Sequence, residues 1–304
     1  MIYHLTPTAQ RKVWGGKNLE RIKKLPQDPF AVPYGETWEI SIHPEGPSFH
    51  NKKELILQEN LEELTYLVKL IDTGEALSVQ VHPDDEYARL HENSSGKSEC
   101  WLILSAEKNS VIYLGMKKSV TREFFLKALD KKENMSEFLN TYQVKPGDFF
   151  YVPAGSIHAI GAGITMIEVQ QNSGITYRVW DWNRVDSKGI SRELHIKKSL
   201  DVINFDSLAN TPDFFKIAHN QFSHPGKIEL ITHPAFKFSL VNLVKYQSIE
   251  IMIPEQKRLA SLLNLQGKLS INGEAIEAFS AVLFRKESKL MITCEENTSF
   301  IFVE

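Results

Sequence analysis

The sequence predicts a mainly β fold with a few helices in its first two thirds. Short segments that alternate apolar with polar residues recur along the chain and are separated by Gly, Pro and Asn turn signals, which is typical of antiparallel sheets. Patterns with helical spacing fall only before residue 204. From these two observations we expect a first unit over residues 1–225, in which helices accompany strands, and an all-β unit over residues 226–304.

The N-terminal part begins with a basic stretch and continues with strands. Residues 10–24 carry lysines and arginines around Trp14, which we interpret as a solvated basic face, with Trp14 able to pack over the mouth of a site. Residues 34–42 alternate like a strand. Residues 51–64 have the spacing of a short helix, and residues 66–71 form an apolar run typical of a buried strand.

The stretch from Leu77 to Pro83 holds the first candidate site residues. Side chains alternate between faces in an extended strand, so Ser78, Gln80 and His82 share one face and the apolar residues share the other. Taken alone, such a strand is more often a surface strand whose polar face meets water. Residues 83–91 then predict a helix with acidic residues in its first turn, where Asp84 and Asp85 act as caps.

Two further segments place ligand-type side chains at the start of strands. Glu99 opens the apolar run that continues to Leu104, and Lys97 shares its face two residues earlier. Lys97 is a candidate for contacting a substrate, although a solvated lysine fits the spacing equally well. The pattern G-x5-P-x-G-x2-H runs from Gly147 to His158, so a strand over 149–152 and a turn bring His158 to the start of the next strand.

The remaining elements of the first unit supply polar residues on one more pair of strands. Residues 119–140 predict one or two helices that begin at Ser119. Residues 167–170 place Glu168 and Gln170 on one face of a strand. Arg178 lies in mid-strand among aromatic residues, so its charge either bridges Glu168 or holds an anionic oxygen of a ligand. Residues 191–203 predict a capped amphipathic helix with His195 on its surface.

The second unit reads as a string of short strands. They lie at 236–244, 249–253, 259–265, 268–271, 281–285 and 290–293, with Gly267 and Asn272-Gly273 as turn signals.

Composition limits the classes of partner. The chain has 304 residues, a formal net charge of -3 and a pI near 6.4, so it lacks the basic surplus that binding to nucleic acid or to an anionic membrane requires. Its two cysteines, Cys100 and Cys294, fit neither a disulfide framework nor a thiolate metal site. The N-terminus lacks the pattern of a signal peptide, and no apolar run is long enough to span a membrane. We expect a cytoplasmic protein that acts on a small molecule.

The motifs resemble those of cupin barrels. Gly147 to His158 is similar to the second cupin motif, and Gln80-x-His82 followed by Glu99 is similar to the first, with Gln80 where many cupins carry histidine. The resemblance implies two cupin-like jelly-roll barrels, of which the second has lost its ligands, because no histidine follows His233. A set of one amide, two imidazoles and one carboxylate suits zinc, or manganese or cobalt, and its single negative charge is typical of a catalytic metal site.

More specifically, the chain resembles type I phosphomannose isomerases in their short bacterial form. The resemblance rests on Gln80-Val-His82-Pro-Asp, Gly96-Lys-Ser-Glu99, Pro146 to His158, and Glu168 to Arg178. It implies isomerisation of mannose 6-phosphate to fructose 6-phosphate through a cis-enediol, with one zinc ion on Gln80, His82, Glu99 and His158. It implies Arg178 as the active-site arginine and Lys97 and Glu168 as residues lining the site. The helical domain inserted in the long forms is missing.

Two other functions fit parts of the pattern. A metal-dependent cupin dioxygenase would carry H-x-H and a redox-active metal, and Gln80 argues against it. A sugar-binding cupin without catalysis would need the pocket but no proton transfer. The general base stays open between Glu168 and Lys97, the phosphate-binding residues are not identified, and a monomer and a homodimer fit the sequence equally well.

Overall fold

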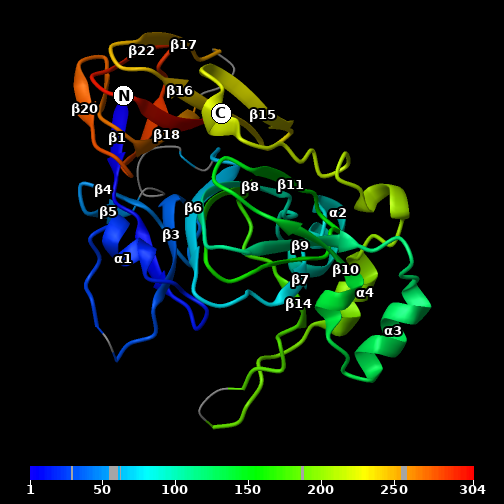
Figure 1. The fold of residues 1–304 in the computed structure, drawn as a ribbon. Coiled ribbons are helices and arrows are strands. Elements are labelled where there is room, and N and C mark those ends of the chain that lie inside the picture. The colour runs from blue at the N-terminus through cyan, green and yellow to red at the C-terminus, as the bar shows by residue number, and fades with distance from the viewer. Residues whose placement is uncertain (29, 55–60, 62, 186–187, 255–258) are drawn as a thin grey trace.

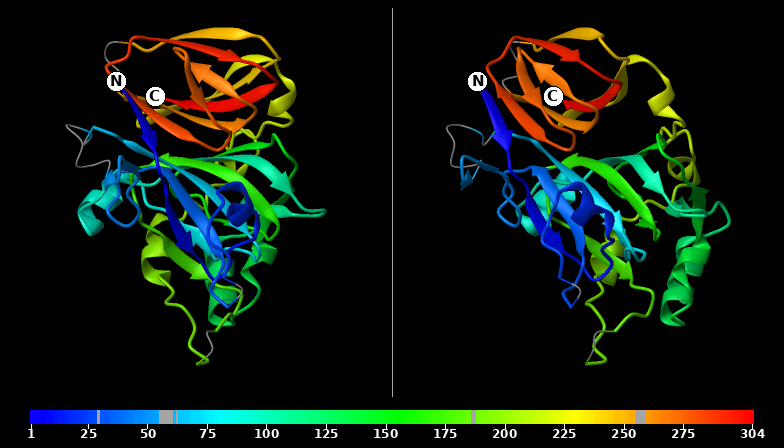
Figure 2. Two further views of the ribbon diagram at one scale, coloured as in Figure 1. Left: turned by 90° about the vertical axis from the view of Figure 1, so that its left-hand side faces the viewer. Right: turned by 60° about the vertical axis from the view of Figure 1, so that its left-hand side comes forward.

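Four β-sheets stacked as layers form the framework of this computed structural model (Figure 1). The structure describes all residues except 29, 55–60, 62, 186–187 and 255–258. The mainly β prediction is confirmed. Two sheets enclose the candidate site, and the other two form the β layers at the opposite end of the molecule, drawn mainly in yellow, orange and red (Figure 2).

The two sheets around the site are antiparallel and are called sheet I and sheet II. Sheet I has the order β11-β8-β13-β6-β3-β2, with bounds β2 Thr8–Arg11, β3 Tyr34–Ile40, β6 Tyr66–Thr73, β8 Glu99–Ala106, β11 Phe149–Val152 and β13 Ile164–Gln171. Sheet II has the order β10-β9-β12-β7-β14, with bounds β7 Val79–Val81, β9 Val111–Met116, β10 Leu139–Gln143, β12 His158–Ile160 and β14 Tyr177–Trp180.

The other two sheets come mainly from the C-terminal part of the chain. Sheet III has the order β1-β21-β18-β23-β16-β15, with bounds β1 Ile2–Leu5, β15 Gly226–His233, β16 Phe236–Leu243, β18 Leu259–Gln266, β21 Ala281–Arg285 and β23 Thr298–Val303. Sheet IV has the order β17-β22-β19-β20, with bounds β17 Ser248–Met252, β19 Leu269–Ile271, β20 Glu274–Ile276 and β22 Lys289–Cys294. A small hairpin pairs β4 Phe49–His50 with β5 Lys53–Glu54.

Apolar side chains fill the space between successive layers. Alternation along each strand gives sheet I two faces: Trp101 and Met166 point toward sheet II, whereas Leu102 and Ile167 pack on sheet III. Sheets III and IV enclose a core of their own. The site therefore lies between two sheets whose outer sides are covered, so its walls are held by packing on both sides.

Few helices accompany the sheets, and they lie near sheets I and II. Their bounds are α1 Asn18–Ile22, α2 Asp85–Glu92, α3 Arg122–Asp130 and α4 Ile196–Val202, with 3-10 turns η2 Met135–Phe138, η3 Ser207–Asn210 and η4 Gln221–Ser223. Helices α3 and α4 contribute to an apolar cluster on the outer face of sheet II. No helix among the described residues has the length and apolar character needed to cross a membrane.

Two predicted helix caps need correction. Asp84 caps α2 by accepting from the Tyr87 amide, but Asp85 is no cap, because its carboxylate accepts from the Gly96 amide at 2.8 Å and from Gln171 at 3.0 Å. The cap of α3 is Thr121 rather than Ser119.

The helix predicted over 191–203 begins only at residue 196, because the amide of the preceding residue, His195, donates to the carbonyl of Arg178 in β14. The helix predicted over 51–64 is wrong at its start, where β5 forms, and the rest falls largely outside the described residues.

Candidate active site

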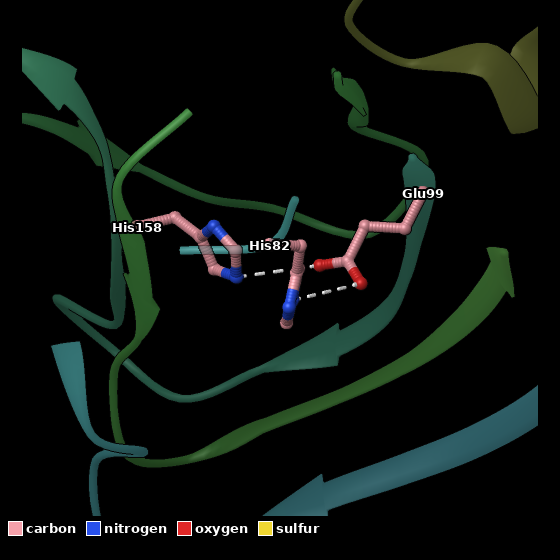
Figure 3. A group of neighbouring side chains, drawn as sticks. All are labelled: His82, Glu99 and His158. Atoms are coloured by element: carbon pink, nitrogen blue, oxygen red, sulfur yellow. Dashed lines mark ion pairs between the residues drawn. The ribbon is translucent and has the colours of Figure 1, made fainter. Parts of the chain in front are cut away.

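Three buried side chains converge between sheets I and II (Figure 3). Glu99 comes from the start of β8 in sheet I, His158 from the start of β12 in sheet II, and His82 directly follows β7. Gln80 in β7 lies opposite His158 in the strand register, so both side chains share one face. The predicted group of Gln80, His82, Glu99 and His158 is thus brought to one place.

The two histidines present the same nitrogen to the carboxylate. Nε2 of His82 lies 3.4 Å from Oε2 of Glu99, and Nε2 of His158 lies 3.4 Å from Oε1. The other ring nitrogen of each is anchored on a backbone carbonyl, His82 on Ile175 at 2.8 Å and His158 on Ser156 at 2.9 Å. These anchors place the ring proton on Nδ1 and leave the Nε2 lone pair directed at the carboxylate.

That arrangement fits a divalent cation. Two imidazole lone pairs and two carboxylate oxygens would repel one another without a positive charge between them. Apart from the ion pair with Lys97 described below, neither buried oxygen of Glu99 has a partner with hydrogen-bond geometry among the described residues, and the three ligand atoms of the group lie within 4.8 Å of one another. Nitrogen and oxygen donors with no thiolate suit zinc or a similar metal.

The ionisation states agree with a metal site. Burial, together with the Lys97 ammonium, lowers the pKa of His82 to about 3, and burial also lowers the pKa of His158, so both rings are neutral near pH 7. Burial alone would raise the pKa of Glu99, but Lys97 and His82 outweigh it and hold that pKa well below its usual value. The group therefore offers neutral imidazoles and an ionised carboxylate, the forms that bind metals.

Lys97 lies inside this group rather than in solvent. Its Nζ is 2.7 Å from Oε2 of Glu99 and 3.1 Å from Nε2 of His82. Burial opposes its charge, but the carboxylates of Glu99 and Glu168 outweigh burial and raise its pKa, so it keeps its proton. The ammonium thus supplies the positive charge that the converging lone pairs require.

Gln80 stands beside His158 with its amide nitrogen toward the ring. Nε2 of Gln80 lies 3.3 Å from Nε2 of His158. A half-turn of the amide exchanges nitrogen for oxygen at the same position, and the oxygen is the atom that a cation would bind. The side chain is therefore placed to serve as a fourth ligand.

Glu168 belongs to a second buried charge group next to the first. Its carboxylate is 3.4 Å from Nζ of Lys69 and accepts from the Trp101 indole at 3.3 Å. Lys69 also lies 4.0 Å from the carboxylate of Glu36, to which the Trp38 indole donates at 2.7 Å. Burial, followed by the charge of Glu99, raises the pKa of Glu168.

Sequence reasoning missed Glu36 and Lys69 as members of the site. The signal for Lys69 was a lysine in the middle of the apolar run 66–71, because a buried lysine needs a partner. Trp14, expected over a site mouth, is buried in the core between sheets I and II, where it packs near Leu77 and Trp101.

Arg178 lies opposite Gln80 in the register of β14 and β7, one strand away from the histidine group. It does not bridge Glu168. Its Nη1 donates to the carbonyl of Glu193 at 2.7 Å, and its buried Nε has no acceptor among the described residues. Burial and the neighbouring charge of Arg192 lower its pKa.

Further arginines gather beside Arg178. Arg184 and Arg192 both bind the carboxylate of Asp181, with Nη2 to Oδ1 distances of 2.5 Å. Together with Glu75, 3.5 Å from Arg184, these residues line a cavity of about 410 Å³. The charge of Glu193 also acts on Arg178, so three guanidinium groups face three carboxylates here and the region carries no charge surplus. The fork of donors on each guanidinium still suits an anionic oxygen.

Comparisons with known proteins all point to one family of enzymes. A family model described as "Phosphomannose isomerase type I, catalytic domain" matches residues 2–109. The chain is 34% identical to mannose-6-phosphate isomerase ManA of Bacillus subtilis over 90% of this chain and 88% of that protein, and 34% identical to mannose-6-phosphate isomerase of Streptococcus mutans over 89% and 87%.

Solved structures share the fold. The mannose 6-phosphate isomerase from Bacillus subtilis superposes with a TM-score of 0.81 at 25% identity, covering 100% of this chain and 99% of that chain. A mannose 6-phosphate isomerase bound with zinc and yttrium superposes with a TM-score of 0.69 at 15% identity, covering 99% and 98%.

Proposed function

The chain belongs to the type I phosphomannose isomerase family, and we propose that it interconverts mannose 6-phosphate and fructose 6-phosphate through a cis-enediol at the site between sheets I and II. The observation that carries this proposal is the convergence of two imidazole lone pairs on the buried carboxylate of Glu99, beside a second buried acid, Glu168.

We assign one zinc ion to Gln80, His82, Glu99 and His158. The donor atoms and their ionisation states support a divalent cation, and a similarly folded isomerase has been solved with zinc. When bound, zinc would polarise an oxygen of the open-chain sugar and so ease removal of the neighbouring proton. The other steps depend on the side chains of this chain.

Glu168 is the proposed general base. The reaction removes a proton next to a carbonyl and returns one to the adjacent carbon, which needs a group whose pKa lies closer to neutrality than that of an ordinary carboxyl. The pKa of Glu168 is raised by burial and by Glu99, whereas that of Lys97 is raised so that it keeps its proton. Lys97 therefore acts as a hydrogen-bond donor and a positive charge beside the reacting oxygens.

Arg178 is proposed to stabilise the negative charge that builds on the sugar oxygens. Arg178 lies on the strand next to Gln80, so its guanidinium can reach an oxygen near the metal, and its Nε donor has no acceptor within the described part of the chain. Arg184 and Arg192, next to the cavity of about 410 Å³, are proposed to hold the phosphate. In this scheme Arg178→Ala lowers kcat while metal is retained, and Arg184→Ala raises KM.

Incubation of mannose 6-phosphate with the metal-loaded protein in deuterated water tests the proposal. We expect fructose 6-phosphate with solvent deuterium at C1, because the abstracted proton can exchange before its return. A protein that binds the sugar without catalysis would leave the substrate unchanged. Product without deuterium would argue against exchange with solvent at the base and would favour a direct hydride shift.

A further inference from the structure

We propose that His195 is a positioning residue for Arg178, holding the arginine backbone in the register that aims its guanidinium at the site. This inference rests on the proposed role of Arg178 in the reaction. The sequence placed His195 on a helix surface, but the structure puts it just before α4, half-buried against β14.

His195 and Arg178 are joined by a reciprocal pair of hydrogen bonds. The His195 amide donates to the carbonyl of Arg178 at 2.7 Å, and the Arg178 amide donates to Nδ1 of His195 at 3.1 Å. A third bond runs from Nη1 of Arg178 to the carbonyl of Glu193 at 2.7 Å. The segment before α4 thus contacts both the backbone and the side chain of the arginine.

The position of β14 explains why these bonds matter. β14 is an edge strand of sheet II, paired with β7 on one side only. On its open side an edge strand leaves backbone groups without partners unless something covers them. The imidazole of His195 provides an acceptor for the Arg178 amide there, so His195 holds both backbone groups of Arg178 on the open side, while β7 pairs with β14 on the other side.

The histidine itself is firmly held. Its carbonyl accepts from the amide of Ser199 at 2.9 Å and from the Ser199 hydroxyl at 2.8 Å, which ties it to the first turn of α4. A backbone amide can only donate, so Nδ1 must carry a lone pair and the ring proton must be on Nε2. The ring therefore acts here through Nδ1, as a hydrogen-bond acceptor.

A matched pair of variants isolates that atom. Asn and Leu have similar shapes, but His195→Asn keeps an acceptor at the δ position and His195→Leu replaces it with a methyl group. With metal-loaded protein and mannose 6-phosphate, we expect His195→Leu to lower kcat about tenfold with KM and metal content unchanged, as follows from one lost hydrogen bond that leaves a donor unpaired. We expect His195→Asn to stay within about twofold of the parent.

A double-mutant cycle with Arg178→Ala separates positioning from general stability, because Asn is also a good helix cap and could stabilise α4. If His195 acts through Arg178, the Leu and Asn variants have equal kcat in the Arg178→Ala background, measured at raised enzyme concentration. If the Leu variant does not fold, His195→Ala, which also removes the acceptor, takes its place.

Two results would overturn the inference: equal kcat of the Leu and Asn variants in the parent, or the same loss in both backgrounds. Full activity of Arg178→Ala alone would instead refute the role assigned to Arg178, and a loss in His195→Leu would then have to arise elsewhere. The failure of the positioning inference and the failure of the proposed role are therefore told apart by the single Arg178 variant.

Discussion

Replacing Lys97 by methionine tests whether its ammonium takes the place of a cation at the Glu99 group. The side chains of Lys97 and Glu99 are 6% and 1% exposed and lie 2.7 Å apart. Methionine keeps much of the volume of lysine and removes the charge. In the metal-free protein the variant leaves the Glu99 carboxylate buried with no compensating charge beside it.

The size of the effect follows from that burial. Removing one partner of a buried ion pair costs about 3–5 kcal/mol, because the remaining charge stays desolvated. For a chain of this size, 1 kcal/mol corresponds to about 1.5 °C in the melting temperature, so metal-free Lys97→Met should melt roughly 5–8 °C below the parent. In the zinc-loaded protein the cation neutralises Glu99, and the difference should shrink to about 3 °C or less.

Thermal unfolding of both proteins, with chelator and with zinc, measures the two differences. Lys198→Met is the matched control, since Lys198 pairs with Glu92 at the same 2.7 Å distance but with side chains 46% and 22% exposed. The control should cost about 0–1 kcal/mol in either condition. An equal lowering of the melting temperature with and without zinc, or no lowering in chelator, would refute the reasoning that lysine and metal balance the same charge.

Other predictions concern the metal, the layer interface and acid stability. His158→Ala should lose zinc and activity together, and elemental analysis that finds one zinc per chain would contradict the ligand assignment. Lys23 binds the fully buried Glu39 at 2.8 Å, so Lys23→Met should lower the free energy of unfolding by about 3–5 kcal/mol in denaturant titrations, and a loss below about 1 kcal/mol would count against the pair. Burial alone would raise the pKa of Glu36, but Lys69 and other partners outweigh burial and lower that pKa. The Glu36 carboxylate therefore contributes fully to the free energy of unfolding above its unfolded pKa near 4.5, and this contribution is lost as pH falls through the lower folded pKa. The stability advantage of the parent over Glu36→Gln should therefore be constant from about pH 6 to 8 and shrink below about pH 4.5, and an advantage that persists in acid would falsify this assignment.

Local patterns in the sequence predict the parts of the site that local structure determines. The alternation of β7 places Gln80 on that strand and His82 directly after it, and the turn before His158 places that residue at the start of β12, so a single local motif predicted each position. Glu99 is predictable for the same reason, because it opens a strand after a turn.

Residues whose role depends on strand register could not be predicted. Glu36 and Lys69 meet Glu168 only because β3, β6 and β13 are neighbours, which no spacing along the chain reveals. The helix expected from residue 191 fails because His195 bonds to the backbone of Arg178, 17 residues earlier, and this contact outweighs local helix propensity. Asp85 has a helix-cap sequence yet bonds to Gly96 and Gln171 for a similar reason.

Strand β1 has a consequence for how the molecule is made. Residues 2–5 pair with residues 281–284, so a strand synthesised early completes a sheet whose other members, between residues 226 and 303, are synthesised much later. Until then β1 has no partner in that sheet, and sheet III can close only after residue 303 has been released.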